Sequence, residues 1–236
     1  MTGASSGVGR AIAVALAEPG TTLIVAGRDR ERLERVAAEV HARGARALVH
    51  CADLTEDAAV DKLASLVTEL GSALEVLVHA MGVIALGRLE STPVDQLDWQ
   101  FRTNVRAPYL ISQALLPALR VRRGQLVFVN STAGLRAGAG VGQYAATKHA
   151  LRALADSLRA EVNPEGIRVI SIYLGQTATP MQEAVHESEG LIYDASQLIQ
   201  AEDVASSVLQ ALHLPRSAEI TDLRIRPGNK PRRSLR

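Results

Sequence analysis

The sequence predicts an α/β protein with a doubly wound parallel sheet flanked by helices. Short apolar or β-branched runs alternate with amphipathic helical patterns along almost the whole chain. Such alternation is typical of parallel strands joined by right-handed helical crossovers. One run, 124–130, is apolar almost throughout, as expected for a strand that helices cover on both faces.

Strands and helices are expected in strict order along the chain. The predicted strands cover 21–27, 45–54, 74–80, 124–130, 167–174 and 218–227. The predicted helices, with apolar residues at helical spacing, cover 28–44, 55–71, 93–120, 141–162 and 201–214. Gly44 and Gly71 mark the ends of the first two helices, and Thr55 is the expected N-cap of the second. Asn163 and Pro164 end the helix that begins at 141.

The chain is expected to form one domain over residues 1–226. A length of 236 residues is ordinary for a single α/β domain, and no repeat or internal linker is visible. The basic segment 227–236 is expected to be a disordered, solvated chain end.

Composition excludes several classes of function. The net charge of +1 gives no electrostatic case for binding nucleic acid or an anionic membrane. Cys51 is the only cysteine, and the six histidines have no metal-ligand spacing, so neither a disulfide nor a metal site is expected. The sequence contains no membrane-spanning apolar run and no signal peptide, so a cytoplasmic protein is expected.

The chain begins with a glycine-rich turn, "TGASSGVG", that has three possible interpretations. It resembles a phosphate-binding turn, in which glycines let backbone N–H groups face a pyrophosphate at a helix N-terminus. Ser5 and Ser6 would add hydroxyl donors. Residues 3–7 also fit the G-x-S-x-G pattern of a nucleophile elbow. The serine of a nucleophile elbow follows several strands of its sheet. No such strands precede Ser5 in this sequence, which disfavours the elbow. A flexible start without a ligand is the third interpretation.

The residues after the first predicted strand favour a phosphorylated cofactor. In dinucleotide folds, an acid at this place binds the adenosine ribose hydroxyls, whereas an arginine accommodates a 2′-phosphate. Gly27 stands where the acid would be, and Arg28 follows it, so NADP(H) is favoured over NAD(H). Asp29 follows directly, and its negative charge would oppose the binding of a phosphate next to Arg28. The alternative is that Arg28 only opens a solvated helix.

Tyr144 and Lys148 are spaced to share one face of a helix. A phenol is a poor base at neutral pH, but a nearby ammonium group lowers its pKa. Tyr144 would then exchange a proton with an alcohol or a carbonyl. Ser131 follows a buried strand, and the carboxyl ends of such strands form the site in doubly wound folds. On its own, the Tyr144–Lys148 pair would fit the solvated face of an ordinary helix. The prediction of a catalytic site therefore depends on finding this pair together with Ser131 and the glycine-rich turn.

This combination resembles the short-chain dehydrogenase/reductase family, which has a single-domain Rossmann-type fold. The resemblance extends over essentially the whole chain. The matching segments are the cofactor turn at 2–9, the Asp53-Leu54 pair, "LVHAMG" at 77–82, Asn104, Ser131, the Y-x-x-x-K pair Tyr144 and Lys148, and "YLGQTATPM" at 173–181. The order and spacing of these segments together are specific to the family.

The resemblance implies a catalytic mechanism. Tyr144 would be the general acid or base, and Lys148 would lower the pKa of Tyr144 and hydrogen-bond the nicotinamide ribose. Ser131 would bind the substrate oxygen, and Asn104 would hold a water in a proton relay. The implied cofactor-binding residues are Gly3, Ser5, Ser6, Gly7, Val8, Arg28, Asp53, Leu54, Ala80, Gly82, Tyr144, Lys148, Gly175, Thr177 and Thr179.

Two departures from the family pattern affect single residues. His79 and Ala80 replace the usual asparagines; Ala80 still permits close backbone approach, and His79 is interpreted as a structural histidine. Leu174 replaces the usual proline before Gly175, which would loosen the following loop without removing a catalytic group.

The third departure is the strand that normally precedes the glycine turn. Only Met1 and Thr2 remain of this central strand. Deleting it would leave the backbone groups of two neighbouring strands without partners and open a void. We therefore expect that the sequence starts late, at a GTG codon read as methionine, and that an in-frame stop codon directly upstream would contradict this. If the strand is truly absent, poor solubility and weak cofactor binding are expected.

Three functions from different classes remain on the sequence alone. The leading one is an NADP(H)-dependent oxidoreductase that interconverts a ketone or aldehyde and an alcohol. The second is a non-catalytic NADP(H)-binding sensor, and the third is a serine hydrolase that uses Ser5. The substrate is expected to be a small molecule held partly by 181–200. A homodimer or homotetramer is expected, packed through 104–120 and 144–162.

Overall fold

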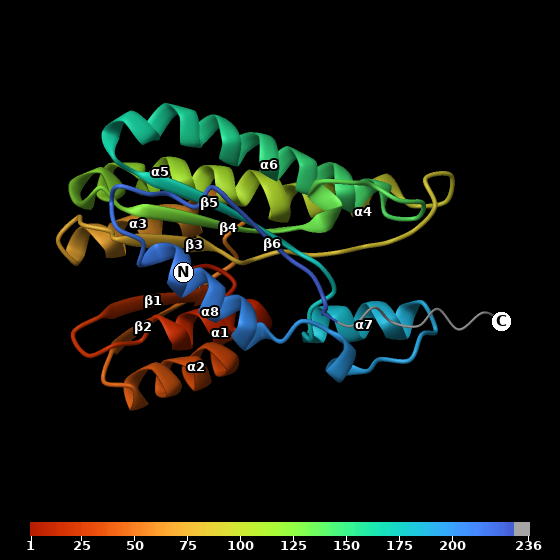
Figure 1. The fold of residues 1–236 in the computed structure, drawn as a ribbon, viewed down its shortest axis with the longest axis horizontal. Helices are drawn as coiled ribbons and strands as arrows, with labels where there is room; N and C mark the ends of the chain where they lie inside the picture. Colours follow the sequence, from red (N-terminus) through yellow and green to blue (C-terminus); the bar gives the residue numbers. More distant parts are fainter. Residues whose placement is uncertain (229–236) are drawn as a thin grey trace.

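The computed structural model describes residues 1–228 and contains a parallel sheet covered by helices on both faces (Figure 1). The strands are β1 (Thr22–Gly27), β2 (Arg46–Cys51), β3 (Val76–His79), β4 (Gln125–Ser131), β5 (Arg168–Leu174) and β6 (Asp222–Ile225). They form a β1-β2 pair and a β3-β4-β5-β6 set, and all named pairings are parallel. The predicted doubly wound α/β fold is confirmed. The predicted disordered tail, 227–236, lies outside the described residues except for 227 and 228.

Met1 and Thr2 lie between the two sets of strands. Thr2 forms parallel bridges to Ala26 of β1 and His79 of β3. The Thr2 N–H donates to the Val78 carbonyl at 2.9 Å, and the Met1 carbonyl accepts from the Ala26 N–H at 2.9 Å. The glycine turn therefore leaves the sheet between β1 and β3. From this point β1 and β2 extend the sheet in one direction, and β3 to β6 extend it in the other. Open α/β sheets bind ligands at such a reversal of strand order.

The helices form two layers. On one face, α3 (Asp57–Glu69), α5 (Ala107–Arg122) and α6 (Gly142–Val162) pack on the sheet through Val60, Leu63, Ile111, Leu119, Leu151 and their neighbours. On the other face, α1 (Gly7–Ala15) and α8 (Ala201–Leu212) cover β3 to β5, while α2 (Arg30–Ala42) covers β1. In β4, Leu126 and Phe128 belong to the first layer and Val127 to the second, as the two-residue period of a strand requires.

Several predicted elements differ from the structure at their ends. The predicted helix 93–120 consists of α4 (Val94–Phe101), a π-helical turn (Arg102–Arg106) and α5. Helix α3 begins at Asp57 with Glu56 as its N-cap, so the expected Thr55 cap is wrong. Thr55 instead donates its N–H and hydroxyl to Asp53 Oδ1, which stabilises the turn before the helix.

The C-terminal part of the chain differs from expectation at one strand and one helix. The last strand, β6, is shorter than the predicted 218–227. Helix α7 (Pro180–Ser188) lies in a segment for which no helix was expected, and it is capped by Thr179, whose hydroxyl accepts from the Gln182 N–H at 3.2 Å.

Candidate active site

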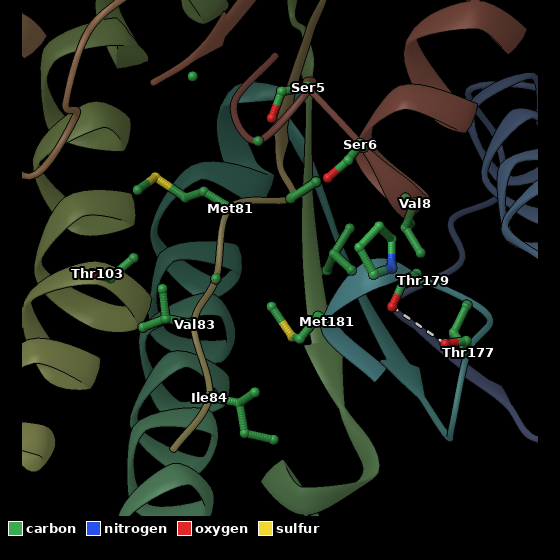
Figure 2. A pocket seen from close by; sticks show the side chains of 18 of the residues that line it. Ser5, Ser6, Val8, Met81, Val83, Ile84, Thr103, Thr177, Thr179 and Met181 are labelled. Atoms are coloured by element: carbon green, nitrogen blue, oxygen red, sulfur yellow. Dashed lines mark hydrogen bonds between the residues drawn. The ribbon is translucent and has the colours of Figure 1, made fainter. Parts of the chain in front are cut away.

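A cavity of about 830 Å³ lies at the carboxyl ends of the parallel strands. Its lining comes from the glycine turn and from the segments that follow β1, β2, β3, β4 and β5, together with α6 and α7. Figure 2 shows the parts of this lining that come from the glycine turn, the segment after β3 and the segment that leads into α7. Every sequence-predicted site residue except Asn104 lines this cavity. Segments distant in the sequence therefore meet at one site.

The glycine turn has a backbone geometry that side chains would block. Gly3 has a φ of +65°, and a Cβ there would lie 2.4 Å from the Met81 backbone nitrogen. A Cβ at Gly9 would lie 1.9 Å from the Gly3 carbonyl oxygen. Helix α1 begins at Gly7 and directs its N-terminus, where N–H groups lack intrahelical partners, at the cavity. This close-packed cradle fits a phosphate group.

Arg28 and Arg32 line the cavity beyond the end of β1. Asp29, which also lines it, forms an ion pair with Arg32 Nε at 3.0 Å and accepts a hydrogen bond from the Arg32 N–H as the N-cap of α2. The carboxylate next to Arg28 is therefore paired with another guanidinium, which leaves Arg28 available to an anion. Sequence reasoning missed Arg32, although its position in the first turn of α2 places it next to Asp29.

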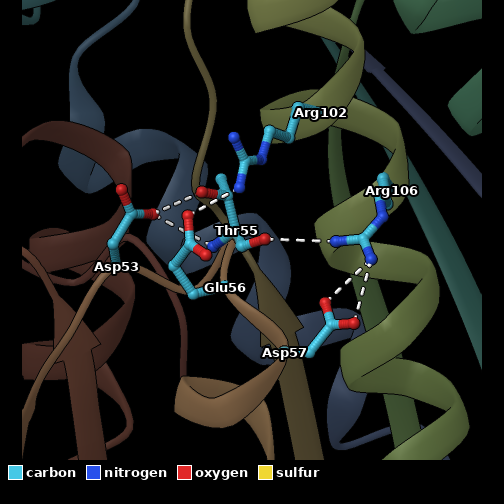
Figure 3. A network of polar contacts seen from close by, with 6 residues as sticks. All are labelled: Asp53, Thr55, Glu56, Asp57, Arg102 and Arg106. Carbon is cyan, nitrogen blue, oxygen red and sulfur yellow. Dashed lines mark hydrogen bonds and ion pairs between the residues drawn. The ribbon is translucent and has the colours of Figure 1, made fainter.

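The turn after β2 is connected to the helix segment that contains Asn104 (Figure 3). Arg106 forms an ion pair with Asp57 at 2.8 Å and donates to the Thr55 carbonyl at 3.2 Å, and Arg102 pairs with Glu56 at 2.6 Å. Partial burial of Asp53 raises its pKa, but the hydrogen bonds from Thr55 outweigh this and hold the pKa below its usual value. Asp53 is thus an ionised side chain of the cavity wall.

Ser131, Tyr144 and Lys148 converge on the cavity from two elements. Ser131 ends β4, and Tyr144 and Lys148 are one turn apart on α6. The Lys148 Nζ lies 5.8 Å from the centre of the Tyr144 ring and donates to the Val129 carbonyl at 3.4 Å. The expected convergence of these three side chains is present.

The pKa values in the ligand-free site differ from the sequence-based expectation for Tyr144. Desolvation raises the pKa of Tyr144 to about 12, and an interaction with the Ser131 side chain opposes this only in part. Burial also lowers the pKa of Lys148 to about 8. The expected depression of the Tyr144 pKa by Lys148 is therefore not seen in the ligand-free protein, because desolvation disfavours the phenolate.

Lys148 is expected to make the free energy of unfolding rise with pH between about pH 8 and pH 10. In this range the unfolded chain still protonates the lysine, whose ordinary pKa is 10.5, whereas the folded chain has lost that proton. Each pH unit contributes at most about 1.4 kcal/mol. Above pH 10 the raised pKa of Tyr144 acts in the opposite direction. Urea unfolding of wild type and Lys148→Met across this range measures the effect, and equal pH slopes for the two proteins would contradict it.

Asn104 lies behind the cavity wall and does not line it. It is fully buried in the π-helical turn, where its Oδ1 accepts from the Val83 N–H at 2.8 Å. Its Nδ2 donates to the Val83 carbonyl at 2.9 Å and to Thr147 Oγ1 at 3.1 Å. The side chain is committed to holding the segment after β3, so a water in a proton relay would have to use another atom of Asn104.

Two buried glutamines hold the same segment, and sequence reasoning missed both. Gln100 Oε1 accepts from the Ala85 N–H at 3.0 Å, and Gln143 Nε2 donates to the Ala85 carbonyl at 3.1 Å. Gln143 directly precedes Tyr144, so this bond connects the cavity wall to the helix of the tyrosine. A glutamine in an amphipathic helix gives no sequence signal for such a contact.

The segment after β5 closes the cavity near the glycine turn. Thr177 Oγ1 donates to the Gly175 carbonyl at 3.0 Å, and Thr179 Oγ1 donates to the Thr177 carbonyl at 3.3 Å. A Cβ at Gly7 would lie 3.0 Å from Thr179 Cγ2, so this threonine is packed close to the start of α1. Gly175, Thr177 and Thr179 thus line the cavity close to the start of α1.

His79 is a structural residue in this fold. It is 2% exposed, stacks on Phe128 with ring centres 4.8 Å apart, and has its Nε2 2.9 Å from Ser112 Oγ. Burial lowers the pKa of His79 to about 3, so it stays neutral. Its ring lies between Phe128 of β4 and Ser112 of α5, outside the cavity lining. This position agrees with the prediction of a structural histidine.

Residues 1–228 contain no cluster of three or more potential metal ligands. None of the helices described there is long and apolar enough to cross a membrane.

Solved structures of other proteins share this fold over nearly the full length. An alcohol dehydrogenase from the archaeon Thermococcus sibiricus, complexed with 5-hydroxy-NADP, superposes with a TM-score of 0.88 at 26% identity and covers 98% of this chain and 97% of its own. A short chain dehydrogenase from Burkholderia cenocepacia in complex with NADP gives a TM-score of 0.81 at 32% identity, with 95% and 94% covered. Both structures contain a cofactor of the NADP type.

Sequence comparison gives the same family. The 1-deoxy-11-beta-hydroxypentalenate dehydrogenase of Streptomyces exfoliatus is 36% identical over 216 residues, which cover 90% of this chain and 78% of the relative. The family model described as short chain dehydrogenase matches residues 1–190. The chain therefore belongs to the short chain dehydrogenase family of oxidoreductases.

Proposed function

We propose that this protein is an NADP(H)-dependent oxidoreductase that interconverts a ketone or aldehyde and an alcohol. The observation that carries the proposal is the meeting of Ser131, Tyr144 and Lys148 at a cavity whose other end is a glycine cradle. A cradle without the three polar residues would fit a binding protein, and the three residues without the cradle would lack a cofactor site. Both lie in one cavity.

The side chains of this chain orient the substrate and move one proton. The Ser131 hydroxyl donates a hydrogen bond to the substrate oxygen and stabilises the charge that develops there. Tyr144 gives its phenolic proton to that oxygen during reduction and takes it back during oxidation. Burial raises the pKa of Tyr144 to about 12 in the ligand-free site, so Tyr144 carries its proton at neutral pH.

Cofactor binding is assigned to the glycine turn and to the ends of β1, β2, β3 and β5. Gly3, Ser5, Ser6, Gly7 and Val8 would hold the pyrophosphate, and Asp53 and Leu54 the adenine. Ala80, Gly82, Gly175, Thr177 and Thr179 would lie along the nicotinamide half, with Lys148 at the ribose. A bound nicotinamide supplies or accepts the hydride. The NADP-bound solved structures and the position of the Arg28 guanidinium, which forms no ion pair within residues 1–228, support NADP(H).

The same cradle would serve a non-catalytic NADP(H) sensor, the second candidate. A sensor would not need a tyrosine and a lysine placed one turn apart against Ser131, and this placement favours the enzyme. The serine hydrolase has less support, because within residues 1–228 Ser5 forms no hydrogen bond with a histidine that could act as its base.

Turnover separates the enzyme from the sensor. Purified protein is mixed with NADPH and a panel of ketones and aldehydes, and the loss of NADPH absorbance is followed with and without carbonyl. Carbonyl-dependent oxidation is expected. Tight NADPH binding without any carbonyl-dependent oxidation would favour the sensor.

Arg28→Ala is expected to weaken NADPH binding by about tenfold or more, because a charge-assisted hydrogen bond to the 2′-phosphate is lost. Binding of NADH, which lacks that phosphate, should change little. Arg30→Ala is the matched control, since Arg30 pairs with Glu34 on α2 and does not line the cavity. Titration of cofactor fluorescence measures both affinities. Equal losses for NADPH and NADH would contradict the assignment of Arg28.

Assembly into a homodimer or homotetramer through α5 and α6 stays a proposal. Tyr109 and Val121 on α5 are at least half exposed, and Phe101 and Trp99 on α4 are slightly less than half exposed. Apolar side chains on a helix surface favour contact with another copy.

A further inference from the structure

One half of the cavity is lined by apolar side chains from two distant segments. Val83 and Ile84 follow β3, and Met181 and Val185 belong to α7. Figure 2 shows Ile84 and Met181 with their side chains directed into the space between the two segments. This apolar wall, defined here as Val83, Ile84, Met181 and Val185, shares the cavity with Ser131 and Tyr144.

The charged side chains of the cavity lie at its other end. Arg28, Asp29 and Arg32 follow β1 and Asp53 follows β2, on the far side of Met1 and Thr2 from β4. Among the described residues, Lys148 is the one charged lining residue on the β4 side, and the proposed function assigns it to the cofactor. The cavity lining also contains Thr132, Gln176 and Gln182, which are polar but carry no charge.

The apolar wall is held in position by the buried amides described above. Asn104 binds both backbone groups of Val83, and Gln100 and Gln143 bind the N–H and the carbonyl of Ala85. Ile84 lies between these two anchored residues. Gln100 and Gln143 are 0% and 7% exposed, so their side chains are buried donors and acceptors for these bonds. The segment is therefore fixed with Ile84 in the lining and has no free backbone polar group at Val83 or Ala85 to offer a charged ligand.

We propose that the substrate is an uncharged, mainly hydrocarbon ketone or secondary alcohol, with no carboxylate, phosphate or ammonium group close to the reacting carbon. The proposal rests on the proposed function and specifies its substrate class. A hydrocarbon ring or chain gains free energy when it displaces water from the apolar wall. An ion at the same place would lose its hydration and find no partner of opposite charge.

Three matched cyclic ketones test the proposal: 4-methylcyclohexanone, 4-oxocyclohexanecarboxylate and the methyl ester of that acid. The acid and its ester have nearly the same shape and differ in charge. The kcat/KM with NADPH is expected to be at least about 100-fold lower for the carboxylate than for the ester, at the upper range of what an apolar pocket achieves. The corresponding alcohols with NADP⁺ are expected to follow the same order.

Ile84→Lys supplies the missing positive charge within the apolar wall. This variant is expected to raise the carboxylate-to-ester ratio of kcat/KM by about tenfold or more, as a charge-assisted hydrogen bond would. Ile84→Met is the matched control, because it keeps a flexible apolar side chain of similar length, and it should preserve the wild-type preference. The ratio within each variant is independent of how much folded protein the variant yields.

The outcomes separate the substrate inference from the proposed function. Comparable kcat/KM values for the carboxylate and the ester in wild type would overturn the substrate inference and leave the oxidoreductase intact. An unchanged ratio in Ile84→Lys would also overturn it, because the apolar wall would then not set the preference. If neither these compounds nor open-chain ketones are turned over while NADPH binds, the proposed function itself falls, and the substrate inference with it.

Discussion

Tyr144→Phe is expected to lower kcat for carbonyl reduction by about 10²- to 10⁴-fold, the usual contribution of a positioned general acid. The substitution removes one oxygen and keeps the ring, so the contacts of the ring with its neighbours and the shape of the cavity wall are preserved. NADPH affinity should therefore change little. Steady-state kinetics with a neutral ketone and cofactor fluorescence measure the two effects separately.

Tyr109→Phe is the control for that experiment. Tyr109 is 50% exposed on α5 and does not line the cavity, so loss of its hydroxyl should leave kcat close to wild type. A Tyr144→Phe protein that keeps wild-type turnover would remove Tyr144 from the mechanism. A large loss in both variants would point to a general effect of removing a phenol.

Gly9→Ala is expected to be the most damaging single substitution for cofactor binding. The added Cβ would lie 1.9 Å from the Gly3 carbonyl oxygen and 2.7 Å from its carbonyl carbon. Both atoms belong to the backbone and cannot move aside as a side chain would. The turn must open, with a loss of about 3 kcal/mol or more in the free energy of unfolding, at the upper end of over-packing. NADPH binding should fall below detection.

Gly138→Ala is the matched control for the glycine turn. A Cβ at Gly138 would meet only Val141 Cγ2, at an ordinary contact distance of 3.9 Å. Thermal unfolding and cofactor titration should show wild-type behaviour for this variant. Normal NADPH affinity in Gly9→Ala would mean that the cofactor does not use the cradle.

The order of strands and helices was predictable because each has a local pattern. The apolar run of β4 and the amphipathic spacing of α6 are properties of contiguous residues, and both elements appear close to their predicted ends. Helix α7 was missed because its segment mixes charged and apolar residues, and its start depends on the Thr179 cap and a proline. The Thr55 cap was wrong because Asp53, two residues before, competes for the Thr55 hydroxyl and N–H.

The site was predictable where a local motif places a residue in the cavity lining, and less so where contacts between distant segments hold the lining in position. Tyr144, Lys148 and Ser131 follow from a spacing on one helix and a strand end. The contacts of Asn104, Gln100 and Gln143 with Val83 and Ala85 join residues far apart in the chain, and no local pattern encodes them. The pKa of Tyr144 also depends on burial, which the sequence alone does not give.

Isotope transfer tests the central claim most directly. NADPH carrying deuterium at both positions of nicotinamide C4 is incubated with the protein and a neutral ketone, and the alcohol is analysed by mass spectrometry. The proposed mechanism predicts one deuterium on the carbinol carbon in wild type and almost no labelled alcohol with Tyr144→Phe. Alcohol formed without deuterium, or no alcohol from any ketone despite NADPH binding, would contradict hydride transfer at this site.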